Sequence, residues 1–223
     1  MAVRFSDHPL VRHKLTRLRD VGTPPSVFRQ LVQEIAMMLA VDATRDLPLA
    51  STVVATPLTT MSDAPVCRTQ ISLVPILRAG LGMLPGALAL LPDANTWLLG
   101  LERDEESLEP RAYYRKITSP ETTDLCLVLD PMLATGGSLC AALTTLKEEG
   151  VRNLRYLGLV AAPEGIAAVE RSHPDTDLYI GALDERLTGD ADELPNGFIW
   201  PGLGDAGDRQ FLTATVLQVK SLA

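Results

Sequence analysis

The feature that most constrains the fold is an alternation of short apolar runs with helical stretches from about Gln70 onward. The pattern predicts strands over residues 71–77, 96–101, 125–129, 154–161 and 178–182. It predicts helices from the glycine-rich turn after residue 77 through Leu91, over 137–149 and over 164–172. Strands that are apolar throughout are buried on both faces, which is typical of parallel strands joined by helices. The chain is therefore predicted to be an α/β protein whose mostly parallel central sheet is covered by helices on both faces.

The N-terminal 50 residues have a different pattern and are predicted to form a helical arm. Residues 8–19 mix leucines with basic residues, as in a short amphipathic helix or an extended arm. Ser26 is a candidate N-cap for a second helix, whose apolar residues recur at helical spacing as far as Leu39 before residues 42–48 break the pattern. The 223 residues fit one domain that spans the chain.

Composition and charge narrow the functional classes. The formal net charge is −8, which disfavours a nucleic-acid-binding protein because such proteins bind phosphates through clustered lysine and arginine. The three cysteines form no disulfide-like framework, and charged residues interrupt any N-terminal signal sequence. The longest apolar stretch, residues 81–91, is too short to span a bilayer. These features predict a soluble cytoplasmic protein without a membrane partner.

The most specific local motif lies between the strand at 125–129 and the helix at 137–149. Asp130 follows the strand, and Ala134, Thr135, Gly136, Gly137 and Ser138 lead into the helix. A helix N-terminus presents unpaired N–H groups, and adjacent glycines let the backbone approach an anion closely. Thr135 and Ser138 add hydroxyl donors, and Ser138 is also a candidate helix cap. The motif predicts a phosphate-binding loop, although glycines that serve only packing would give a similar turn.

Other motifs are excluded at this point of the chain. The loop lacks the Gly-Lys-Ser/Thr ending of a nucleoside-triphosphate-binding loop, because no lysine follows until Lys147. His8, His13 and His173 form no ligand cluster or catalytic triad, so no set of protein metal ligands is expected.

The loop and several other segments resemble the uracil phosphoribosyltransferases, a branch of the type I phosphoribosyltransferases. In the wider group two adjacent acids usually precede the loop, whereas here Asp130 is followed by Pro131. The resemblance runs from His8 to Arg209 and is carried by HPLV at 8–11, PILRAGLGM at 75–83, RDEE at 103–106, DPMLATGGS at 130–138, AAPEGI at 161–166 and PGLGDAGDR at 201–209.

The resemblance implies a set of site residues. The 5-phosphoribosyl diphosphate (PRPP) site would comprise Arg78, Arg103, Asp130, Pro131, Met132, Leu133, Ala134, Thr135, Gly136, Gly137, Ser138 and Asp205. Uracil would meet Ile199, Gly204, Asp205 and Ala206 in a hood formed by residues 184–212, and Arg78, Asp130 and Asp205 would serve catalysis. Arginine suits the pyrophosphate group because its guanidinium stays charged and donates two parallel hydrogen bonds. Residues 102–123 would form a hairpin lid over the site.

The implied reaction joins PRPP and uracil to give UMP and pyrophosphate in pyrimidine salvage. Mg²⁺ is the implied cofactor, bound mainly through PRPP and water, and a homodimer or larger homo-oligomer with GTP as a possible allosteric effector is implied as well. Residues 188–196 are longer than usual for the family, and Leu212 stands where glycine is usual. Two alternatives stay open: an enzyme of the same fold that uses another base, such as a purine, and a regulatory protein of this fold that binds nucleotides and RNA.

Overall fold

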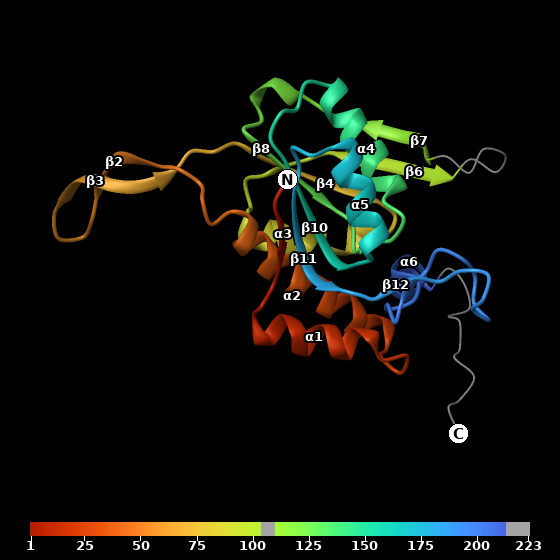
Figure 1. Ribbon diagram of the computed structural model, residues 1–223. Coiled ribbons are helices and arrows are strands. Elements are labelled where there is room, and N and C mark those ends of the chain that lie inside the picture. Colours follow the sequence, from red (N-terminus) through yellow and green to blue (C-terminus); the bar gives the residue numbers. More distant parts are fainter. Residues whose placement is uncertain (104–109, 213–223) are drawn as a thin grey trace.

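The computed structural model describes residues 1–103 and 110–212, which are built around a twisted central sheet (Figure 1). The strand order across the main sheet is β1-β11-β10-β8-β4-β6-β7. All neighbouring pairs in this path are parallel except β6 and β7, which are antiparallel. In that order the strands are β1 (Val3–Phe5), β11 (Asp177–Leu183), β10 (Leu154–Ala161), β8 (Leu125–Leu129), β4 (Ile71–Leu77), β6 (Leu98–Arg103) and β7 (Pro110–Lys116). Two short strands join it, β5 (Asn95–Thr96) beside β4 and β9 (Met132–Leu133) beside β10.

Helices cover both faces of the sheet, as the sequence predicted. One apolar cluster lies between the sheet and α1 (Pro9–Arg19), α2 (Pro25–Ala43) and α3 (Leu84–Leu90), and the other lies under α4 (Gly137–Glu148) and α5 (Pro163–Ser172). Alternate residues of β8 divide between them, with Leu127 in the first cluster and Cys126 and Val128 in the second. The predicted α/β architecture with a mostly parallel sheet is confirmed.

The N-terminal segment differs in detail from the prediction. The helix expected near residues 8–19 is α1, and the side chain of His8 caps it by accepting a hydrogen bond from Leu10 N at 3.1 Å. The expected N-cap at Ser26 is wrong, because α2 begins at Pro25, a residue type favoured at the first helical position. Strand β1, which the sequence did not predict, pairs with β11, and both helices pack in the main core.

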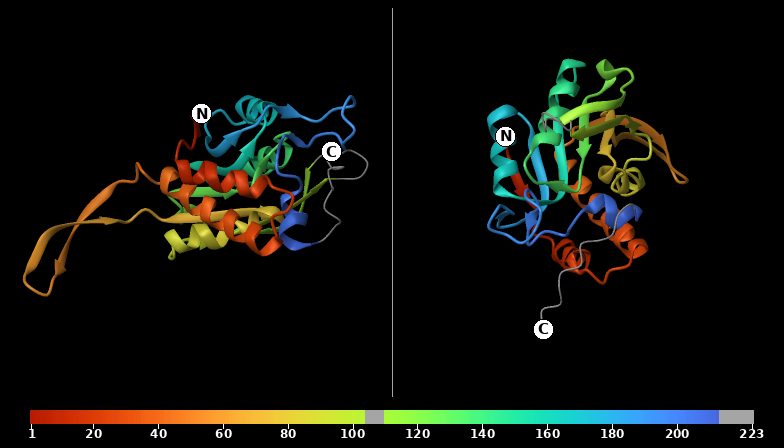
Figure 2. Two further views of the ribbon diagram at one scale, coloured as in Figure 1. Left: turned by 90° about the horizontal axis from the view of Figure 1, so that it is seen from below. Right: turned by 90° about the vertical axis from the view of Figure 1, so that its right-hand side faces the viewer.

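A hairpin of β2 (Leu49–Ala55) and β3 (Thr60–Cys67) was not predicted. The two strands pair only with each other among the described residues and project far from the body of the protein (Figures 1 and 2). Both strands are mostly exposed and carry polar residues, so their sequences lack the apolar pattern that predicts a strand.

The chain after β11 lies at the opposite end of the molecule from this hairpin (Figure 2). It contains the paired strands β12 (Arg186–Leu187) and β13 (Ile199–Trp200), followed by α6 (Ala206–Phe211). Two 3₁₀ turns complete the fold, η1 (Ala79–Gly82) after β4 and η2 (Pro120–Thr122) after β7. None of the described helices combines the length and apolar character needed to cross a membrane.

Candidate functional site

A cavity of about 350 Å³ lies where β4 and β8 end, between the sheet and the chain after β11. Parallel strands present their carboxyl ends on one side of the sheet, and ligands of open α/β sheets bind there. The cavity is lined by Ile76, Leu77, Arg78, Ala79, Leu101, Asp130, Met132, Ala134, Ser138, Gly197, Phe198, Ile199, Gly204 and Asp205. Predicted site residues that are far apart in the sequence, from Arg78 through Asp130 to Asp205, therefore line one cavity.

The loop between β8 and α4 has the shape that its glycines suggested. Gly136 is the N-cap of α4 and has a φ of +85°, a conformation in the left-handed region that favours glycine. A Cβ there would lie 2.8 Å from the Ala168 Cβ and 3.0 Å from the Gly165 carbonyl oxygen, both in α5. Ser138 is the second residue of α4 and lines the cavity, so the prediction that it caps the helix is wrong. Backbone packing on α5 thus fixes the turn that aims the helix N-terminus at the cavity.

Asp130 stands at the strand end that begins this loop. Its backbone is held twice: its N–H donates to Leu157 O at 3.2 Å, and its carbonyl accepts from the Tyr156 hydroxyl at 2.7 Å. Burial raises the pKa of the Asp130 carboxyl to about 7, and the nearby negative charge of Asp205 acts in the same direction. A carboxyl with such a pKa changes charge near neutral pH.

The remaining residues of the loop divide between the protein core, the surface and the wall of the cavity. Leu133 is buried in the core beneath α4, and Pro131 supplies a carbonyl that accepts the N–H groups of Leu159 and Val160. Thr135 is exposed, and its hydroxyl lies 3.4 Å from Gly137 N. Met132 and Ala134 line the cavity.

Of the two arginines predicted to bind PRPP, Arg78 and Arg103, the structure describes the side chain of Arg78 only. Arg78 follows a cis peptide bond at the end of β4, is largely exposed at the cavity, and has its guanidinium 3.7 Å from the Asp208 carboxylate. A Cβ at Gly80, two residues later, would lie 2.2 Å from Leu129 O, so this turn packs directly on the end of β8. Arg103 is the last residue of β6, and its side chain lies outside the described part of the chain, as do the remaining RDEE residues, 104–106.

The predicted hood lies over the cavity from the side of α6. Ile199 is buried and lines the cavity with Gly204 and Asp205, whereas Ala206 is buried in the core and is not a lining residue. Asp205 caps α6 by accepting a hydrogen bond from Asp208 N at 2.9 Å. This capping role is the one expected of an aspartate in a turn, and it leaves the residue at the cavity edge.

Two buried charges hold the hood on the body of the protein. The Arg209 guanidinium donates to Leu18 O and Leu203 O at 2.7 Å and to Asp20 O at 2.6 Å, and it stacks over Phe28 at 4.4 Å. Asp184 accepts from Arg19 at 2.7 Å and from Gly202 N at 2.9 Å. The hood is therefore anchored to α1 and α2 by hydrogen bonds as well as by apolar packing.

Some lining residues were missed by sequence reasoning. Gly197 and Phe198 line the cavity, although no local motif marks them. Trp200, next to Ile199, is not a lining residue; it lies under the Arg186 guanidinium at 5.5 Å and is 40% exposed. Strand alternation explains this outcome, because Ile199 faces inward and its neighbour must face outward.

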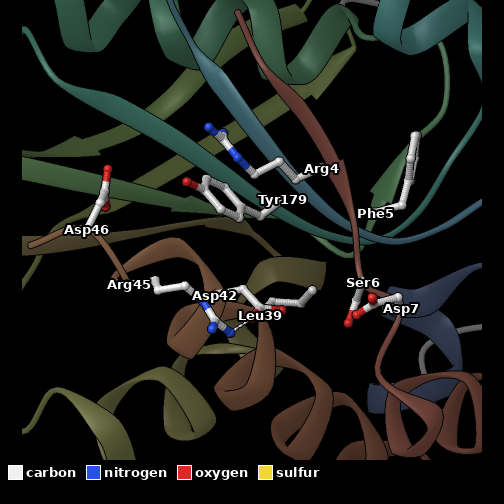
Figure 3. Close-up of a pocket in the computed structure, with 9 residues that line it drawn as sticks. All are labelled: Arg4, Phe5, Ser6, Asp7, Leu39, Asp42, Arg45, Asp46 and Tyr179. Carbon is white, nitrogen blue, oxygen red and sulfur yellow. Dashed lines mark hydrogen bonds and ion pairs between the residues drawn. The ribbon is translucent and has the colours of Figure 1, made fainter.

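A second cavity, of about 320 Å³, lies between β1 and the end of α2 (Figure 3). Arg4 and Arg45 line it, but Arg4 pairs with Asp177 and Arg45 pairs with Asp42, both at 2.9 Å. Three carboxylates, Asp7, Asp42 and Asp46, line it as well. This balance repels a phosphorylated ligand, so the cavity at the strand ends is the stronger candidate for one.

The fold and the cavity are those of the type I phosphoribosyltransferase class: a mostly parallel sheet, a glycine-containing turn between a strand-end aspartate and a helix N-terminus, and a hood. A model of the family described as uracil phosphoribosyltransferase matches residues 5–213. A uracil phosphoribosyltransferase of Roseiflexus sp. (strain RS-1) is 50% identical over 211 residues, which cover 95% of this chain and 98% of that protein. One of Bacillus licheniformis is 49% identical over 207 residues, covering 93% and 96%. The structure of the AQ2163 protein from Aquifex aeolicus superposes with a TM-score of 0.86 at 35% identity, over 95% of this chain and 99% of that one. The chain belongs to the uracil phosphoribosyltransferase family.

Proposed function

We propose that the protein transfers the 5-phosphoribosyl group of PRPP to N1 of uracil, giving UMP and pyrophosphate in pyrimidine salvage. Membership of the family supports this activity. The observation that carries it is the cavity itself, where Arg78, Asp130, Ser138 and the hood residues Ile199 and Asp205 line one space. PRPP joins an anionic phosphate, a ribose and a pyrophosphate, and this arrangement offers a separate group to each.

The residues act by positioning and by electrostatic stabilisation. The N-terminus of α4 and the loop at Gly136 would hold the 5′-phosphate. Arg78 would turn from Asp208 to the departing pyrophosphate, on which negative charge grows as its C1–O bond to the ribose breaks and the C1–N1 bond to uracil forms. Asp130 would accept hydrogen bonds from the ribose hydroxyls. Ile199 and the backbone at Gly204 would hold the base against C1, and the hairpin of β6 and β7 would exclude water.

Mg²⁺ fits this site as a companion of PRPP. Among the described residues no group of three or more histidine, cysteine or acidic side chains is placed to hold a metal ion alone. The negative charge of Asp205 contributes to the raised pKa of Asp130, so a cation between substrate and protein would relieve that repulsion. Bound with PRPP, Mg²⁺ would neutralise charge on the leaving pyrophosphate.

The central test mixes the full chain with PRPP, Mg²⁺ and either uracil, cytosine, hypoxanthine or guanine, and measures nucleotide and pyrophosphate release. UMP is the expected product, and EDTA should abolish its formation. Efficient product with a purine and none with uracil would reject the proposal in favour of the other-base alternative. A parallel series with added GTP tests for activation.

The pKa of Asp130 leads to a pH prediction. Above pH 7 its carboxyl is ionised and accepts hydrogen bonds from ribose better than the acid does, so kcat/KM for PRPP should rise between pH 6 and 8. In Asp130→Asn this rise should disappear and the KM for PRPP should increase. An unchanged profile in the variant would assign the titration to another group.

The same substitution should have the opposite effect on stability. Because the folded-state pKa of Asp130 is raised, the native protein binds more protons than the unfolded chain between about pH 4 and 7. Stability is therefore lost as the pH rises from about 4 to 7, and at pH 8 Asp130→Asn should be more resistant to urea than the wild type. The gain should shrink as the pH falls.

We propose further that the protein is a homodimer in which the β2–β3 hairpin packs on a second copy. A lone two-stranded hairpin is marginally stable in water, so its length calls for a covering surface. Its exposed side chains include Leu49, Val53, Val54, Leu58 and Met61. Apolar surface of this kind marks protein interfaces.

The homodimer is tested by a charge on the hairpin. Val53 is 68% exposed, and Val53→Asp should convert the dimer to monomer in light scattering, because the carboxylate would be buried on association. Ser62→Asp, which adds the same charge at an exposed polar position of β3, is the control. A wild-type protein that is monomeric at assay concentration would exclude this interface.

A further inference from the structure

The buried side chain of Gln210 connects the two substrate-binding segments, a feature that the assigned site residues do not include. Gln210 lies in α6 with no solvent exposure. Its Nε2 donates to Ala206 O at 2.8 Å and to Ala79 O at 3.1 Å. Ala206 is the residue after Asp205 in the hood, and Ala79 is the residue after Arg78 in the turn. One amide group therefore holds carbonyls on the base side and on the pyrophosphate side of the cavity.

The amide oxygen of Gln210 shows how closely α6 packs against the turn after Arg78. Gln210 Oε1 is buried and accepts no hydrogen bond from the described residues. It points at Gly82 in η1, where an added Cβ would lie 1.5 Å from it. A bulkier residue at position 82 would displace the amide. Because Gly82 has no side chain, the Gln210 amide of α6 has room to contact the turn after Arg78.

Other contacts of α6 do not supply this link with equal strength. The ion pair between Arg78 and Asp208 joins the same segments, but it is 3.7 Å long and the Arg78 side chain is 58% exposed, so it contributes little. Arg29 donates to the Gln210 carbonyl at 2.7 Å and Arg209 reaches α1, which fixes α6 to the helical layer and not to η1. The Gln210 amide is a buried, hydrogen-bonded connection between the hood and the turn.

We infer that Gln210 is a positioning residue that couples occupation of the pyrophosphate subsite at Arg78 to binding of the base under the hood. The inference rests on the proposed function for the identity of the two ligands. Pyrophosphate bound at Arg78 would restrain the Ala79 carbonyl in the turn, and the Gln210 amide, which binds that carbonyl, would hold α6 in its base-binding position. Coupling of this kind is reciprocal and has a measurable size.

The test uses two ligands that cannot react together, uracil and pyrophosphate with Mg²⁺. Uracil Kd is measured on the full chain by equilibrium dialysis, with and without saturating pyrophosphate. In the wild type, pyrophosphate should tighten uracil binding about 5-fold or more. In Gln210→Met, which keeps the side-chain length and loses both hydrogen bonds, the ratio of the two Kd values should approach one.

Two further variants make the result specific. Arg29→Met removes a hydrogen bond to the same residue from α2 and should keep the wild-type ratio. Gly82→Ala keeps Gln210 but pushes its amide away from both carbonyls, so it should lose the coupling even if Gln210→Met does not fold. A wild type without coupling, or a Gly82→Ala variant with full coupling, would overturn the inference. Failure of the proposed function would appear separately, as no UMP formation by the wild type.

Discussion

Gly136→Ala is expected to lower kcat/KM for PRPP by about 10²-fold while the protein stays folded. The alanine must adopt a φ of +85° and places its Cβ 2.8 Å from Ala168 and 3.0 Å from Gly165 O. Relief of these contacts moves the loop that leads into α4, and a displacement of about 1 Å is enough for a loss of this size. Steady-state kinetics with PRPP varied at saturating uracil measures the effect.

Gly150→Ala is the matched control for backbone strain. Gly150 lies just past the other end of α4 with a φ of +94°, but no atom lies within 4 Å of an added Cβ. This variant should lose about 1 kcal/mol of unfolding free energy and keep its PRPP kinetics. An equal loss of activity in both variants would mean that α4 stability, and not the loop position, limits the reaction.

Arg209→Met is expected to have the largest effect on stability, lowering the free energy of unfolding by about 3 kcal/mol. The substitution removes the hydrogen bonds of the guanidinium to the carbonyls of Leu18, Leu203 and Asp20, of which Asp20 O keeps the Thr23 N–H as a donor at 3.1 Å. It also removes the stacking over Phe28. Because these groups fix the hood, the KM for uracil should rise as well. Urea unfolding and steady-state kinetics measure the two effects.

A second hood arginine provides the comparison. Arg186 also stacks on an aromatic ring, that of Trp200, and pairs with Asp192 at 2.7 Å, but it is exposed to solvent. Arg186→Met should therefore change the urea midpoint little. If Arg209→Met were equally mild, burial of its guanidinium would not be what holds the hood in place.

Two departures from the usual family sequence, Leu212 and the long segment 188–196, affect only the local structure around them. Leu212, where the family usually has glycine, has a φ of +56° just after α6. Such a conformation costs a non-glycine residue about 1–2 kcal/mol, and the side chain is 68% exposed, so no burial offsets it. The long segment at 188–196 closes on itself, because the Thr188 hydroxyl donates to Pro195 O at 2.7 Å and Arg186 pairs with Asp192.

The sequence by itself determined the sheet, its helical cover and the loop after β8. Apolar runs with no polar face can be satisfied only by burial on both sides, so β4, β8 and β10 were predicted with their observed bounds. The loop was recognisable because glycines and hydroxyl residues between a strand and a helix are local chemistry. Residues such as Val3–Phe5 gave no such signal, because a three-residue edge strand is defined by its partner β11.

Only the tertiary structure decided which distant residues share the cavity and how they are held. Gly197 and Phe198 line it because the hood folds back across the sheet, and Ala206 does not because its helix faces the core. The raised pKa of Asp130 and the two hydrogen bonds of the Gln210 amide likewise depend on neighbours that are remote in the chain. Local pattern encodes which face of an element is buried, whereas contacts between elements arise from packing that no short stretch of sequence contains.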